Sequence, residues 1–238
     1  MIVANCRSSI TERDLEFLVD ALAGSDADFP ALRSLAEDPD AVDRLLDSPV
    51  LFERLLEAPR LLHISPYFFY YVLVRRAFLD HGLDHRVATD YVAALMSHHT
   101  QRAGDRPARE TPYLVDLVLA SAEARTSQRS FELQAEVGNR ALMLAGLFPD
   151  WIYHRFTYGR RPVSLEYYEE MGRRHYAAAA RTEPARRLDL VVPLGFLGEA
   201  FSEVRQALND LVDAHLHLAP RPETVDRLFR QALYRVRN

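Results

Sequence analysis

The nine histidines are the residues of this chain that could most readily hold a metal. A carboxylate-bridged di-iron bundle carries Glu-x-x-His, because two residues three apart share a helix face and can grip one ion. The residues three positions before the histidines are Arg60, Phe78, Gly82, Leu95, Met96, Trp151, Gly172, Val212 and Ala214. None is a carboxylate, and this argues against the di-iron class.

Weaker pairings of potential ligands remain. They are His81 with His85, His98 with His99, Asp150 with His154, and Asp213 with His217. A metal site needs two cooperating pairs or a third ligand, and Asp80 to His85 has the composition of a turn between helices. We therefore predict no metal and no bound cofactor, with these histidines capping helices or facing water.

Several other reaction classes are excluded by residue type. The chain has no lysine, so all 29 basic residues are arginine, and Schiff-base, pyridoxal-phosphate and phosphate-loop chemistry lack their amine. Cys6 is the single cysteine, so neither an intramolecular disulfide nor a cysteine-based zinc site can form. The motifs His-Glu-x-x-His, Gly-x-Ser-x-Gly and Gly-x-Gly-x-x-Gly are absent too.

Polar and aromatic residues on otherwise apolar helices are the remaining candidates for a site. Buried hydroxyls and charges need partners, and an apolar pocket with a few polar groups is the usual form of a small-molecule site. The candidate ligand-binding residues are His63, Tyr67, Tyr71, Glu136, Arg140, His154, Tyr158 and His175. They would form one pocket only if their three stretches converge; otherwise they are core residues, and for His175 the alternative is a hydrogen-bonded core histidine.

The charge pattern gives no general attraction for nucleic acid. The formal net charge is −5, the isoelectric point is about 6.0, and the arginine doublets between Arg160 and Arg187 are interleaved with glutamates. At helical spacing, Glu169 with Arg173 and Glu170 with Arg174 predict ion pairs on a solvated face.

Most of these residues are expected on helices whose ends are marked by capping signals in the sequence. Thr11 to Asp14 resembles a capping box, and Ser48-Pro49, Ser65-Pro66 and Thr111-Pro112 each place a hydroxyl before a proline at the first helical position. The further helices are expected at about 30–37, 40–46, 84–100, 128–147, 149–158, 164–181, 188–216 and 221–237. Pro193 and Gly195 are expected to kink the helix 188–216 or to delay its start. This pattern predicts an all-α bundle of nine to eleven helices with no significant sheet.

We expect residues 1–238 to form a single domain, because the helices on both sides of the polar stretch 101–111 are too apolar to stand alone; that stretch is where a division into two would fall. The longest strongly apolar run, Pro66 to Val74, is too short to cross a bilayer, and Met1 to Ile10 does not read as an export signal. A cytoplasmic protein with no membrane partner is the expectation.

The function that these patterns favour is a non-catalytic helical binding or regulatory protein whose partner is another protein or a small apolar molecule. The alternative is an enzyme or redox protein with a histidine-ligated metal or haem in the bundle, so whether the protein is an enzyme stays open. The helix count and lengths resemble many bundles, haem-oxygenase-like and tetracycline-repressor-like proteins among them, a likeness that carries no function. A homo-oligomer is compatible with either function.

Overall fold

The computed structural model describes residues 2, 5–57, 64–102, 114–158 and 163–216. Within these ranges the chain is helical and contains no strand, so the prediction of an all-α fold is confirmed. The helices are α1 (Glu12–Leu22), α2 (Phe29–Ala36), α3 (Pro39–Leu46), α4 (Pro49–Glu57), α5 (Pro66–Asp80), α6 (Arg86–Arg102), α7 (Leu114–Ala122), α8 (Ser127–Leu147), α9 (Pro149–Tyr158), α10 (Leu165–Ala180), α11 (Glu183–Arg187), α12 (Val191–Glu199) and α13 (Phe201–Leu211). Short 3₁₀ segments η1 (Arg7–Ser9) and η2 (Asp26–Asp28) precede α1 and α2, and a π-helical segment η5 (Val212–Leu216) follows α13.

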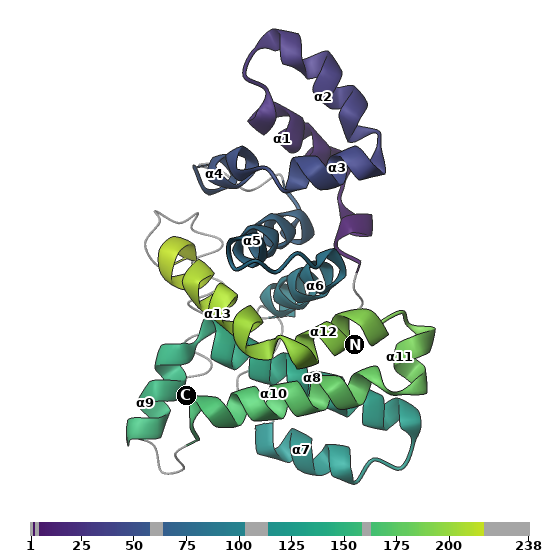
Figure 1. Ribbon diagram of the computed structural model, residues 1–238, viewed down its shortest axis with the longest axis vertical. Coiled ribbons are helices and arrows are strands. Elements are labelled where there is room, and N and C mark those ends of the chain that lie inside the picture. Colours follow the sequence, from purple (N-terminus) through teal and green to yellow (C-terminus); the bar gives the residue numbers. More distant parts are fainter. Residues whose placement is uncertain (1, 3–4, 58–63, 103–113, 159–162, 217–238) are drawn as a thin grey trace.

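Helices α1 to α4 form a layer at one end of the molecule, which we call the N-terminal layer (Figure 1). The capping box predicted at Thr11 is present, because the Thr11 hydroxyl accepts from the backbone N–H of Asp14 and the Asp14 carboxylate accepts from that of Thr11. Asp14 is fully buried and also accepts from the backbone N–H of Ser65 at 2.7 Å and from its hydroxyl at 2.8 Å. One carboxylate thus ties the start of α1 to the start of α5.

Helix α5 lies between this layer and the rest of the molecule, beside α6 (Figure 1). Its apolar residues continue all the way round, and Phe68 to Arg75 are buried on every face. The Ser65 hydroxyl accepts from the backbone N–H of Phe68, as the Ser-Pro signature predicts. A helix without a polar face is stable only inside a protein, and α5 has that position here.

The opposite end is built on the pair α8 and α10, which pack along each other with α7, α9, α12 and α13 around them (Figure 1). Two glycines let the helices approach closely. A β-carbon at Gly138 would lie 2.6 Å from the ring of Tyr176, and one at Gly172 would lie 2.1 Å from the ring of Phe201. Small residues at these crossings therefore determine how deeply the aromatic rings enter the core.

The single helix predicted at 188–216 is wrong, because this segment forms α12, α13 and η5, with a break at Ala200. The first of these helices begins only at Val191, so the start is delayed, and Pro193 lies in its first turn, where the missing N–H has no helical partner to lose. On the two sides of the break, Gly198 lies against the backbone of Ala177 and the Phe201 ring fills the space over Gly172.

The predicted helix 221–237, the helix start at Thr111 and the connection 101–111 lie outside the described residues, apart from the end of α6. Buried hydrophobic side chains of the described residues form one continuous cluster from Ile2 to Val212. Of the helices described, none combines the length and the apolar character needed to cross a membrane.

Candidate functional site

The two candidate tyrosines on α5 differ in how deeply they are buried. Tyr67 is half-buried in the first turn, and Tyr71 is completely buried one turn later. Burial raises the pKa of Tyr71 to about 12, although a hydrogen bond from Arg86 acts in the opposite direction. His63 lies outside the described residues. Tyr71 therefore faces the contact between α5, α6 and the N-terminal layer.

An ion cluster fills that contact. Arg75 of α5 is 1% exposed, and its guanidinium binds both oxygens of Asp47, with Nε to Oδ1 at 2.7 Å and Nη2 to Oδ2 at 3.0 Å. Nη2 also donates to Oδ1 of Asp84 at 2.6 Å. Arg86 donates to the same Asp47 carboxylate at 2.5 and 3.1 Å. Asp47, directly after α3, is thus shared by two arginines from two other helices.

The electrostatics of Asp47 follow from that arrangement. Burial acts to raise the pKa of its carboxyl, but hydrogen bonds and charge from Arg75 and Arg86 outweigh burial, so the pKa lies below its ordinary value. Arg7 adds a contact from η1, with its Nη2 2.6 Å from Oδ1 of Asp43. The cluster holds charges in pairs, and it fixes the N-terminal layer on α5 and α6 without offering a group for chemistry.

A second polar group lies between α6, α8 and α10. The side-chain oxygen of Asn139 accepts hydrogen bonds from the hydroxyls of Tyr91 and Tyr176, each at 2.9 Å. All three side chains are buried, and burial raises the pKa of both phenols well above the ordinary value. The sequence reasoning missed this group. Its signal was an amide directly after Gly138, on a helix that also carries the small residues Ala135, Ala141 and Ala145.

Glu136 and Arg140, predicted to lie near the core boundary of α8, are less enclosed than expected. Glu136 is exposed and Arg140 is half-buried. Burial lowers the pKa of Arg140, while the nearby charges of Glu136 and Tyr168 act to raise it. The tyrosine near Arg140 is thus Tyr168 of α10.

His175 of α10 makes the hydrogen bond expected of a core histidine. It is half-buried, and its Nδ1 lies 2.8 Å from the carbonyl oxygen of Met171, to which it donates. Burial lowers the pKa of the ring, and the neighbouring charge of Arg174 lowers it further. A neutral ring bound within its own helix positions that helix. The side chains of His154 and Tyr158 are outside what the structure describes.

The candidate residues thus fall into two groups. Tyr71 lies beside the ion cluster beneath the N-terminal layer, Glu136 and Arg140 lie on α8 with Arg140 near Tyr168 of α10, and His175 bonds within α10. Among the described residues, no three or more His, Cys, Asp or Glu side chains are grouped so that they could hold a metal ion. The buried thiol of Cys6 has a pKa raised by burial, which leaves it a poor nucleophile.

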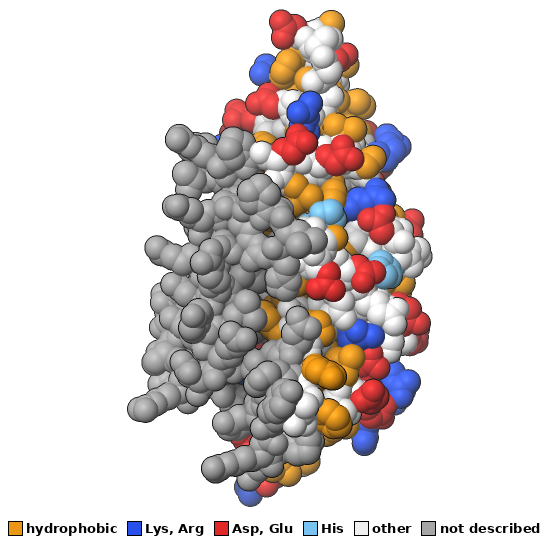
Figure 2. Space-filling model, turned by 90° about the vertical axis from the view of Figure 1, so that its left-hand side faces the viewer, with side chains coloured by type: hydrophobic (Ala, Val, Ile, Leu, Met, Phe, Trp, Pro, Cys, Tyr) orange, Lys and Arg blue, Asp and Glu red, His pale blue; other side chains and the backbone are white. Residues whose placement is uncertain are grey.

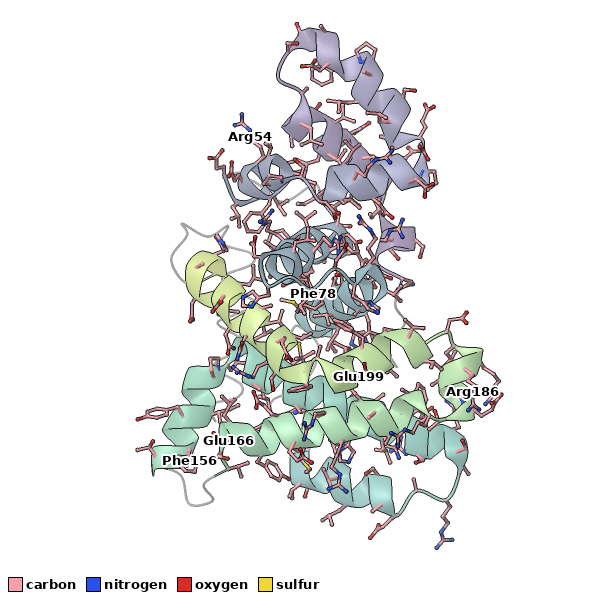
Figure 3. The ribbon with its side chains drawn as sticks, viewed as in Figure 1. Arg54, Phe78, Phe156, Glu166, Arg186 and Glu199 are labelled. Atoms are coloured by element: carbon pink, nitrogen blue, oxygen red, sulfur yellow. The ribbon has the colours of Figure 1, made fainter. Side chains whose placement is uncertain are left out.

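The surface offers a different feature on α9. Ile152 anchors this helix in the core, whereas Tyr153 is 71% exposed and Phe156 is 48% exposed. The two aromatic residues are three apart and so lie on one face of the helix. Phe156 lies at the edge of the molecule in Figure 3, and Figure 2 shows hydrophobic side chains gathered on that face at the height of α9. We call Tyr153 and Phe156 the α9 aromatic pair.

No family model, curated protein or solved structure matches this chain.

Proposed function

We propose that the protein is a non-catalytic binding protein that recognises a protein partner through the α9 aromatic pair. The observation that carries this proposal is the exposure of Tyr153 and Phe156 on one helix face beside a buried anchor, Ile152. Aromatic side chains supply much of the binding energy at protein interfaces, because each buries a large area with few rotatable bonds.

The polar groups of the interior support a binding role over catalysis. The Asn139 side chain accepts from two tyrosines, His175 bonds to its own helix, and Asp47 is neutralised by two arginines. Each of these groups is engaged with another part of the scaffold. The surface of α9, by contrast, keeps two large apolar rings in water.

The test compares Tyr153→Ser/Phe156→Ser with Leu119→Ser, which removes another exposed apolar side chain, 61% exposed on α7. Affinity capture with wild-type protein identifies a partner, and the Kd is then measured with both proteins purified. An aromatic residue central to an interface contributes about 2 kcal/mol or more, so the double variant should bind roughly 100-fold more weakly or worse. The Leu119→Ser control should bind as wild type does.

Two results would overturn the proposal. One is a partner whose Kd is the same for wild type and for the α9 double variant. The other is purified protein that carries about one metal ion or haem per chain, found by elemental analysis and absorption spectroscopy, since that would favour the enzyme or redox alternative.

A further inference from the structure

Three consecutive residues at the start of α6 bind three different parts of the molecule. Asp84 binds Arg75 of α5, and Arg86 binds Asp47 after α3. Between them, His85 lies against Phe196 of α12, with ring centroids 4.2 Å apart. The ion pair between Arg86 and Asp47, which ties the first residue of α6 to the N-terminal layer, is therefore one residue from a histidine.

His85 is the N-cap of α6. Its carbonyl oxygen accepts from the backbone N–H of Thr89 at 3.0 Å, and its ring Nδ1 accepts from that of Ala88 at 3.1 Å. Because a backbone N–H can only donate, Nδ1 carries no proton here and the ring is neutral, with its hydrogen on Nε2. A side-chain acceptor at this position satisfies one of the free N–H groups at the helix start.

Protonation of this ring removes the cap. The imidazolium has an N–H on both nitrogens, so Nδ1 would confront the N–H of Ala88 as a second donor. It would also place a positive charge at the positive end of the helix macrodipole, next to Arg86. Both effects disfavour the first turn of α6.

The neighbouring charges decide what the loss of the cap affects. The charges tied to this turn are Asp84 and Arg86 beside the ring, Arg75 on α5, and Asp43 and Asp47 on and after α3. The packed elements α5, α6 and α12 also carry Arg76, Asp80, Asp90 and Glu199. Arg86, the first residue of α6, donates to Asp47 at 2.5 Å and to the carbonyl oxygen of Asp43 at 3.1 Å. Fraying of this turn would thus withdraw a direct contact with α3.

His81, at the other end of the same turn, contacts α13, since its Nε2 lies 2.9 Å from Oδ2 of Asp210.

We propose that His85 is a pH-sensitive cap that loosens the first turn of α6, and with it the hold on α3, when its ring is protonated. The inference is independent of the binding role of α9.

The experiment measures single-amide hydrogen exchange by NMR on the full chain at pH 7.5 and 5.5, with intrinsic rates corrected for pH. In wild type, protection of the Ala88 amide should fall roughly fivefold at the lower pH, the worth of a typical cap, and the amides of α3 should follow. His85→Asn keeps a capping oxygen that does not titrate, so its protection should be unchanged between the two pH values. His81→Asn is the matched control and should behave as wild type does at Ala88.

Unchanged protection in wild type, or the same fall in His85→Asn, would overturn the proposal. The ¹⁵N shifts of the wild-type imidazole give a second readout that needs no variant. A proton on Nδ1 of His85 at pH 7.5 would contradict the cap even if His85→Asn failed to fold.

Discussion

Replacement of Asn139 by leucine should destabilise the fold by removing the acceptor of two buried hydroxyls. Tyr91 and Tyr176 are 1% and 0% exposed, and each donates to the Asn139 oxygen at 2.9 Å. A buried donor left without an acceptor costs about 1–3 kcal/mol, so two of them should lower the free energy of unfolding by roughly 4 kcal/mol. Leucine has the same branched shape as asparagine but is larger, so no cavity forms, and loss of the two hydroxyl oxygens in the triple variant below makes room for it.

The same geometry predicts that the loss can be reversed. Tyr91→Phe alone leaves Asn139 with one donor and should cost about 1 kcal/mol. The triple variant Tyr91→Phe/Asn139→Leu/Tyr176→Phe has no unsatisfied group, and the Tyr176 ring position over Gly138 is still filled. Its stability should therefore return to within about 1 kcal/mol of wild type.

Urea unfolding followed by far-UV circular dichroism measures all four proteins. Thermal unfolding midpoints provide a second measurement of how the four proteins rank in stability. The reasoning would be refuted if Asn139→Leu cost less than about 1 kcal/mol, or if the triple variant were no more stable than Asn139→Leu.

Three further predictions concern packing and charge. Gly172→Ala should lower the free energy of unfolding by about 3 kcal/mol, because its β-carbon would lie 2.1 Å from the Phe201 ring. Gly195→Ala is the control: its β-carbon would have nothing within 4 Å, so it should raise the free energy of unfolding by up to about 1 kcal/mol. Equal effects of the two substitutions in urea unfolding would contradict the packing argument. Asp47→Asn should lower the free energy of unfolding by about 3 kcal/mol at pH 7. The pKa of Asp47 is lowered in the folded state, so its stabilisation is present above its unfolded pKa near 4 and is lost as the pH falls through the folded pKa. Urea unfolding of wild type and Asp47→Asn at pH 7 and pH 3 measures this loss. Asp80→Asn, which removes the exposed partner of Arg76, is the control and should change the stability little. A cost of Asp47→Asn that is the same at both pH values would contradict the prediction. A double-mutant cycle on Glu136 and Arg140 should give a coupling below about 1 kcal/mol, because Glu136 is exposed, and a larger coupling would show that the pair is enclosed after all.

The sequence by itself determined where many helices begin. The capping box at Thr11, the proline start of α4 and the serine cap of α5 all form where the sequence predicts them. These signals involve groups within three or four residues of one another, so they need no knowledge of the rest of the fold. The turn at Asp80 to His85 is local in the same way, and the chain reverses there with Gly82 at a φ of +71°.

The candidate site could be predicted only in part, because charges and hydroxyls reveal that a partner is needed but not which one. Arg75 stood out as a charge on an apolar helix, yet its partner Asp47 is 28 residues away. Glu169 was predicted to pair with Arg173 at helical spacing, but it binds Arg205 of α13 at 2.5 Å, and Arg173 binds Glu170 instead.

Only the tertiary structure decided the features that depend on two helices at once. The break at Ala200 lies between two close contacts with α10, those of Gly198 and Phe201, and no residue at the break itself predicts it. The ring of His85 contacts Phe196 because α12 packs against the start of α6, whereas its cap on Ala88 is a local hydrogen bond of the kind the sequence predicted as one alternative for these histidines. Local hydrogen bonds are set by neighbours in the chain, whereas close packing is set by the shapes of surfaces that the sequence does not place side by side.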